Sequence, residues 1–145
     1  MSQKLIAVAS DHAGFKLKSA LLSLLHNDGF KALDLGAYSN DSVDYPVYAS
    51  KLINVIEAGD AECGIIICGS GIGISIAANR SLSIRAALCR DKDDATMARR
   101  HNDANVIALS GQRTEVNEAW GLVKIFLNTK FDGGRHARRV DQLSQ

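Results

Sequence analysis

The sequence is poor in the features that mark secreted, zinc-ribbon and membrane-spanning proteins. Among 145 residues there are one proline and three cysteines, Cys63, Cys68 and Cys89, and no two cysteines have CxxC spacing. An odd number of cysteines without that spacing argues against a disulfide framework and against a zinc ribbon. No stretch approaches the roughly 20 apolar residues of a membrane span, and the apolar run at the N-terminus is short. We therefore expect a cytoplasmic protein.

Neither positive nor negative charge is in marked excess. The chain has 17 lysines and arginines against 16 acidic residues, a formal net charge of +1. No global field would hold nucleic acid or an anionic membrane, so neither is expected as a partner, and any anion site must be local. The 46% hydrophobic and 23% charged residues are ordinary for a globular chain, and the length fits one domain over residues 1–145.

Short apolar runs alternate with segments of helical periodicity along the chain. The pattern predicts strands over residues 4–10, 31–35, 63–68, 84–89 and 105–110, and helices over residues 15–25, 45–58, 72–79, 93–100, 115–128 and 135–143. Strands that alternate with helices form right-handed βαβ units. We therefore predict an α/β fold, a Rossmann-like three-layer sandwich with a five-stranded parallel sheet and helices on both faces.

Polar or glycine-rich segments follow three of the predicted strands. Asp11 and His12 follow the first strand, a glycine-rich loop follows the third, and Arg113 follows the fifth. Ligands of such sheets bind outside the carboxyl ends of the strands, where these residues are expected to meet. For Asp11 two interpretations stay open, a helix cap and a polar contact to a substrate.

The glycine-rich loop has the pattern G-x-G-x-G, formed by Gly69, Gly71 and Gly73. Glycines at the start of a helix let backbone N–H groups turn toward an anion, although a tight turn would require them as well. Isoleucines stand where a dinucleotide fingerprint would have its third glycine, and the Gly-Lys-Ser/Thr ending of a P-loop is missing. The loop therefore predicts an anion cradle and gives little support to nucleotide binding.

Two residues are candidates for proton transfer near this loop. Cys68 ends the third strand, where a helix N-terminus and converging amides would favour a thiolate that acts as a base or nucleophile. A buried small hydrophobic residue is the alternative for Cys68, and it is the preferred interpretation for Cys63 and Cys89. His101 follows a helix and is expected near the same rim as a proton carrier, with a solvated histidine at a helix end as the alternative.

Near the C-terminus, Arg135 and Arg139 stand four residues apart in a predicted helix. Both guanidinium groups would then lie on one face of the helix and could clamp a phosphate together. The alternative interpretation is a basic helix that is simply solvated.

Five blocks of the sequence together resemble one protein family. They are SDHAGF (10–15), DYPVYA (44–49), CGSGIGISIAANR (68–80), RHNDANV (100–106) and GGRHARRV (133–140). In this order and spacing they closely resemble type B ribose-5-phosphate isomerase, part of a sugar-phosphate isomerase family that also includes galactose-6-phosphate isomerase subunits. The likeness covers nearly the whole chain. It implies interconversion of ribose 5-phosphate and ribulose 5-phosphate through an enediol, without a metal or an organic cofactor.

The resemblance also implies a role for each matching residue. Cys68 matches the family's base, Ser70 a hydroxyl that assists it, and His101 the residue that opens the furanose ring. Asp11 and Tyr45 match sugar-contacting positions; His12, Arg113, Arg135 and Arg139 match the phosphate-binding set; Asn102 and the amides of Gly69 to Gly73 match contacts to substrate oxygens and to the enediolate. Family sites are built between subunits, which implies a homodimer or a dimer of dimers whose C-terminal helix, about residues 135–145, reaches the partner.

The sequence departs from parts of the family pattern. Some members carry a glutamate shortly after the glycines as their base, whereas this chain has Ile74 and Ser75 there and follows the cysteine pattern. The loop from Leu109 to Arg113 is a residue longer than usual before its arginine. Isomerases of galactose 6-phosphate, allose 6-phosphate or a tetrulose phosphate stay open as alternatives. A non-catalytic phosphosugar-binding module is more remote, because it would leave Cys68 and His101 without a task.

Overall fold

A computed structural model describes residues 5–145, so the predicted strand residue Lys4 lies outside the described part. Five strands form one sheet in the order β2-β1-β3-β5-β4, and every pairing is parallel. They are β1 (Leu5–Ser10), β2 (Lys31–Asp34), β3 (Cys63–Cys68), β4 (Ala86–Leu88) and β5 (Val106–Ser110). At least one helix connects each strand to the next, which confirms the predicted α/β alternation.

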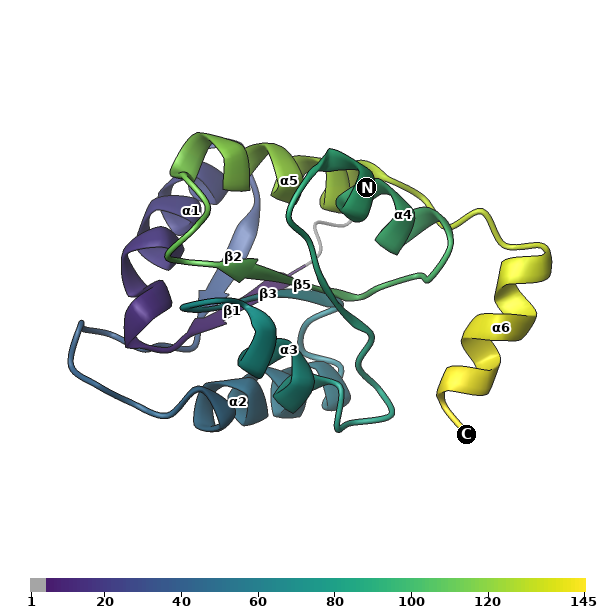
Figure 1. Ribbon diagram of the computed structural model, residues 1–145, viewed down its shortest axis with the longest axis horizontal. Coiled ribbons are helices and arrows are strands. Elements are labelled where there is room, and N and C mark those ends of the chain that lie inside the picture. The colour runs from purple at the N-terminus through teal and green to yellow at the C-terminus, as the bar shows by residue number, and fades with distance from the viewer. Residues whose placement is uncertain (1–4) are drawn as a thin grey trace.

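Helices cover both faces of the sheet (Figure 1). They are α1 (Phe15–Asn27), α2 (Tyr45–Glu57), α3 (Ile72–Ala78), α4 (Lys92–Arg100), α5 (Val116–Asn128) and α6 (Arg135–Leu143), with a short 3-10 helix, η1 (His12–Gly14), before α1. Figure 1 shows α1, α4 and α5 above the sheet and α2 and α3 below it. No helix within residues 5–145 has the length and apolar character to cross a membrane.

The central strand β3 shows why an apolar run without polar alternation forms a strand here. Its side chains enter two separate cores, one on each face of the sheet. Ile65 and Ile67 pack with residues of α1, α4 and α5, whereas Ile66 and Cys68 pack with residues of α2 and α3. Because helices cover both faces of the sheet, the residues that point to either face can be apolar. The strand is therefore a continuous apolar run.

The observed helix and strand boundaries agree with the predicted ones to within two residues. The largest difference at a strand is the start of β4, which was predicted at residue 84 and begins at Ala86. Ile84 instead closes a turn, in which its N–H donates to the carbonyl of Ser81 at 3.1 Å. Moreover, β4 is an edge strand that pairs only with β5, so no second neighbour extends it.

Helix α6 stands apart from the rest of the fold. Figure 1 shows it at the right, away from the sheet, on the side opposite the carboxyl ends of β1, β3 and β5. Val140, 8% exposed, is its one buried residue. At its far end Ser144 donates from Oγ to the carbonyl of Leu82 at 3.3 Å. A helix with so little buried surface depends on few contacts for its position.

A buried lysine supports the end of β2. Lys18 of α1 has a side chain that is 1% exposed, and its Nζ lies 2.8 Å from Oδ1 of Asp34, whose side chain is 37% exposed. The same Oδ1 accepts the N–H of Gly36 at 3.0 Å, and the rings of Phe15 and Tyr38 flank the ammonium group. The pair therefore ties α1 to the loop that follows β2.

We predict that Asp34→Ala destabilises the protein by about 2–3 kcal/mol, because it leaves the buried Lys18 ammonium group without its charged partner. The double variant Lys18→Met/Asp34→Ala should recover most of this loss, since the uncompensated charge is then absent. The free energies of unfolding are measured in urea. A single variant as stable as the wild type would contradict the assigned importance of the pair.

Candidate active site

The carboxyl edge of the sheet, where the five strands end, holds the first group of predicted site residues. Asp11 follows β1 and caps η1, since its Oδ1 accepts the N–H of Gly14 at 3.1 Å. Its own N–H donates to the carbonyl of Ile67 at 3.1 Å, which places it against the end of β3. The structure thus confirms the cap interpretation of Asp11, and a substrate contact stays a prediction.

The imidazole of His12 is held in a defined orientation at this edge. Its Nδ1 accepts the backbone N–H of Val43 at 3.1 Å. A neutral imidazole that accepts at one nitrogen carries its proton on the other, so Nε2 of His12 is a donor. This arrangement suits a ligand oxygen, such as one of a phosphate or a sugar.

The glycine loop after β3 is shaped by close backbone packing. Gly71 has a φ of 78°, a conformation that favours glycine, and it caps the start of α3. A Cβ at this position would lie 2.6 Å from Cδ1 of Leu88 and 2.9 Å from the carbonyl oxygen of Leu109. Ser70 accepts the N–H of Ile72 through Oγ at 3.1 Å. The loop therefore packs directly on the end of β5 and is anchored to α3.

Tyr45 and Gly73 are in contact across the loop. A Cβ on Gly73 would lie only 2.8 Å from Cζ of the Tyr45 ring and 3.1 Å from its hydroxyl oxygen. The first residue of α2 is thereby brought to the first turn of α3. The absence of a side chain at Gly73 makes room for the ring.

Cys68 lies at the end of β3, below the glycine loop. It is 4% exposed and packs in the apolar core on the α2 and α3 side of the sheet. Its carbonyl accepts the N–H of Gly111 at 2.9 Å. This position is compatible with both interpretations from the sequence. The thiol is buried, as a small hydrophobic residue would be, and it lies four residues before the start of α3, where a thiolate would be favoured.

Ser110 connects the glycine loop to Arg113 and was missed in the sequence analysis. Its buried Oγ donates to the carbonyl of Gly69 at 2.6 Å and accepts the N–H of Arg113 at 3.1 Å. The exposed Arg113 is therefore placed at the same edge as Cys68 and the glycines. The sequence feature that could have indicated this role is a serine at a strand end, three residues before an arginine.

The second group of predicted residues lies at the opposite, amino edge, where the strands begin. His101 caps the C-terminal end of α4, with its N–H donating to Met97, and β5 starts only at Val106. The expectation that His101 shares a rim with Cys68 is therefore wrong within one chain. A helix that follows a parallel strand runs back, so its last residues lie near the start of the next strand.

The other residues of this second group are close to His101 in the chain or in space. Asn102 is exposed and lines a cavity of about 380 Å³, together with Leu82 and Leu143. Arg135 and Arg139 are exposed on α6, four residues apart as predicted. Thus one chain presents Asp11, His12, Tyr45, Cys68, Ser70, the glycines and Arg113 at one edge, and His101, Asn102, Arg135 and Arg139 at the other.

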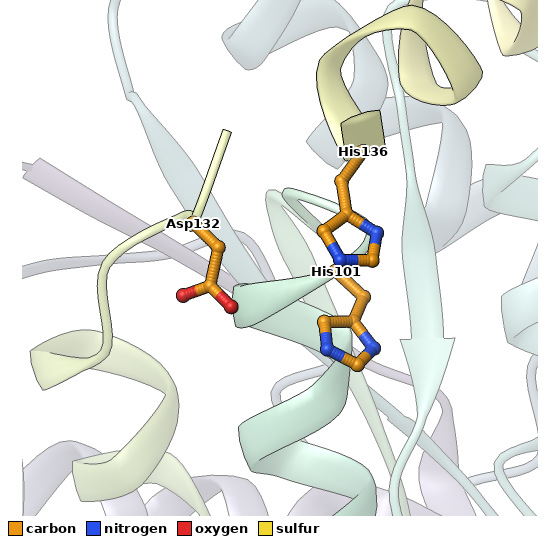
Figure 2. Close-up of side chains that lie close together, drawn as sticks. All are labelled: His101, Asp132 and His136. Atoms are coloured by element: carbon orange, nitrogen blue, oxygen red, sulfur yellow. The ribbon is translucent and has the colours of Figure 1, made fainter. Parts of the chain in front are cut away.

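His136, which was not predicted as a site residue, stacks on His101 (Figure 2). The ring centroids are 4.2 Å apart and the rings are 11° from parallel. Asp132 approaches both rings from the side, and Arg100 holds its carboxylate at 3.1–3.2 Å. The hydrogen bond from Arg100 holds the pKa of Asp132 below its usual range.

Desolvation is the main cause that lowers the pKa of His136 from its usual value of 6.5. The charges of His101, Arg135 and Arg139 act in the same direction, and that of Asp132 opposes them. The neutral form of the His136 imidazole is therefore favoured relative to that of a free histidine.

His101, Asp132 and His136 each have one atom that could bind a metal ion, and these three atoms lie within 4.8 Å of one another. Two histidines and a carboxylate are ligands that transition metals accept. However, each imidazole binds a metal in its own ring plane, and a single ion does not lie in the planes of two parallel, stacked rings. Arg100, Arg135 and Arg139 add positive charge nearby. This geometry suits an anion better than a cation.

The chain is similar in sequence to proteins of one family. A model of the family described as Ribose/Galactose Isomerase matches residues 6–143. The chain belongs to the ribose/galactose isomerase family. It is 39% identical to the ribose-5-phosphate isomerase B of Escherichia coli, covering 97% of this chain and 95% of that protein. It is 43% identical to a putative sugar phosphate isomerase of Rickettsia typhi, covering 95% and 96%.

Solved structures of family members agree with the fold. A ribose 5-phosphate isomerase from Thermotoga maritima superimposes with a TM-score of 0.96 at 47% identity, covering 99% of both chains. The type B enzyme of Trypanosoma brucei gives a TM-score of 0.94 at 38% identity, covering 99% of this chain and 98% of that one. The predicted family and fold class are therefore confirmed.

We predict that the imidazole of His136 titrates below pH 6.5 and that Asp132→Asn lowers this pKa further. The reason is that the Asp132 carboxylate stabilises the protonated ring, so its removal disfavours protonation. The histidine signals are followed by NMR between pH 4 and 8, with Asp141→Asn, on the same helix, as the control. A higher pKa for His136 in Asp132→Asn would contradict the assigned interaction.

Proposed function

We propose that the protein is an aldose–ketose isomerase that interconverts D-ribose 5-phosphate and D-ribulose 5-phosphate. The observation that carries the proposal is Cys68, buried at the end of β3 below a glycine loop, in a chain of this isomerase family. Relatives at 39% and 47% identity are named ribose-5-phosphate isomerases. The reaction would belong to the pentose phosphate pathway.

The chemistry follows from a base placed beside an oxyanion site. In the open-chain aldose, the Cys68 thiolate removes the proton on C2, and the electron pair moves through the C1–C2 bond to the aldehyde oxygen. Backbone N–H groups of Gly69, Gly71 and Gly73 stabilise the resulting enediolate oxygen, an effect for which one lost donor typically costs about 3–4 kcal/mol. A proton passes from the C2 hydroxyl to the O1 oxyanion, which moves the negative charge to O2. The thiol then returns its proton to C1, the C2 oxygen becomes the carbonyl, and the thiolate is regenerated.

Ser70 and His12 have supporting roles in this proposal. The Ser70 oxygen accepts the N–H of Ile72, so its hydroxyl hydrogen is available to donate to the thiolate. The donor at Nε2 of His12 is suited to an oxygen of the phosphate group. Arg113, Arg135 and Arg139 complete the phosphate-binding set, Asp11, Tyr45 and Asn102 contact the sugar, and His101 opens the furanose ring.

A complete site requires both groups of residues, and we propose that two copies of the chain supply them. Cys68 and the glycine loop of one subunit would face His101, Arg135 and Arg139 of another, with α6 reaching across. Exposed apolar side chains on α2 and α3 support an interface, namely Val47, Ile72 and Ile76, of which Ile76 is 60% exposed. The assembly would be a homodimer or a dimer of dimers.

The sugar phosphate itself has close alternatives. The family description names both ribose and galactose isomerases, and several relatives are named only as putative sugar phosphate isomerases. Incubation with ribose 5-phosphate in the presence of a chelator, beside galactose 6-phosphate, allose 6-phosphate and a tetrulose phosphate, separates these substrates by their rates. A cytoplasmic location stays a prediction from the sequence.

We predict that Cys68→Ala lowers turnover of ribose 5-phosphate about 10²–10⁴-fold, the contribution typical of a general base. Binding of ribose 5-phosphate, measured by calorimetry, should be retained because the phosphate contacts remain. Cys63→Ala, at the other end of the same strand, is the matched control and should keep wild-type turnover. Wild-type turnover in Cys68→Ala would remove the base assignment.

Mixing two weakly active variants tests the shared site. We predict that Cys68→Ala and His101→Asn, refolded together in equal amounts, recover about a quarter of wild-type activity, because half of the dimers are mixed and each mixed dimer has one intact site. The variants carry different tags, so mixed dimers can be purified and assayed alone. If purified mixed dimers are no more active than either parent, both residues act within a single chain.

A further inference from the structure

The ring of His136 brings α6 into contact with His101 at the end of α4. It lies on the same side of α6 as Val140, four residues later, which is the buried residue of the helix. Arg135 and Arg139 project from an adjacent, exposed face. The stacked ring of His136 therefore lies between the helix that carries these two arginines and the imidazole of His101.

The segment before α6 is fastened to the same place. The N–H of Asp132 donates to the carbonyl of Arg100 at 3.0 Å, and the two side chains form an ion pair. The His101 ring therefore has the His136 ring on one face and the Asp132 carboxylate beside it, as Figure 2 shows. Rotation of the His101 ring about χ1 or χ2 would break the stack.

A neutral His136 ring suits this arrangement, because it adds no charge beside the His101 ring. Two protonated imidazoles stacked at 4.2 Å would repel each other. Desolvation and the charges of His101, Arg135 and Arg139 lower the pKa of His136, and the charge of Asp132 opposes them. The environment of His136 thus favours its uncharged form, which adds no repulsive charge to the stack.

We propose that His136 is a positioning residue that fixes the plane of the His101 imidazole for opening of the substrate's furanose ring. This inference rests on the proposed function, in which His101 performs that step. His136 acts through His101 by ring stacking and does not itself exchange a proton with the substrate. Its contribution is therefore confined to the step that only a cyclic aldose requires.

The test compares two substrates that differ in this step. Ribose 5-phosphate must be opened, whereas 4-deoxyribose 5-phosphate lacks the hydroxyl that closes the furanose ring. For His136→Ala we expect kcat/KM to fall about tenfold with ribose 5-phosphate, equivalent to about 1.4 kcal/mol, and less than about twofold with the 4-deoxy compound. His136→Phe keeps a ring that can stack and should retain most of the activity. His26→Ala, an exposed histidine at the end of α1, is the control.

A double variant gives an independent measurement. If His136 acts only through His101, then His101→Asn/His136→Ala should turn over ribose 5-phosphate no more slowly than His101→Asn alone. An additional loss in the double variant, or equal losses with both substrates in His136→Ala, would overturn the proposal and leave His136 a purely structural residue. A wild-type protein inactive on ribose 5-phosphate would instead refute the proposed function.

Discussion

Parallel strand pairing decides where each residue of this protein can act. Every strand ends at the same edge of the sheet, and every connecting helix returns the chain to the other edge. Residues directly after strands, such as Asp11 and Cys68, therefore gather at the carboxyl edge. Residues directly after helices, such as His101, gather at the amino edge. No local change of sequence moves a residue from one group to the other.

The two edges differ in how firmly their side chains are held. Within residues 5–145, four polar residues are buried, and all four lie at or beside the carboxyl edge: Ser10, Asp11, Lys18 and Ser110. At the amino edge, the candidate site residues are half-buried or exposed, and His101 is held by the ring stack with His136. The polar groups of the carboxyl edge are thus held within the fold, whereas the positions of the candidate site residues at the amino edge depend on a few contacts of α6.

The fold was predictable because its signals are local and repeated. Alternating apolar runs and helical segments located all five strands, and the glycine loop after β3 marked the candidate site. The position of His101 was predicted wrongly, because a helix between parallel strands runs back along the sheet, so a residue that follows such a helix lies at the amino edge and not beside Cys68. Ser110, Asp132 and His136 were missed since their partners, Gly69, Arg100 and His101, are distant in sequence or unremarkable in pattern.

In the proposed function, the division of the site residues between two edges of the sheet links proton transfer to assembly of subunits. The proposed base, Cys68, and the proposed oxyanion loop lie at the sheet edge that holds its polar side chains most firmly, where errors of about 1 Å in position would be costly to catalysis. Arg135 and Arg139, proposed to bind phosphate, are carried by α6. His101, proposed to open the furanose ring, lies at the end of α4, where His136 of α6 stacks on it. If a second subunit covers α6, its surface immobilises these groups at the same time as it brings its own Cys68 to them. A lone chain would then retain its fold and its thiol and still lack the means to open and hold a cyclic sugar phosphate.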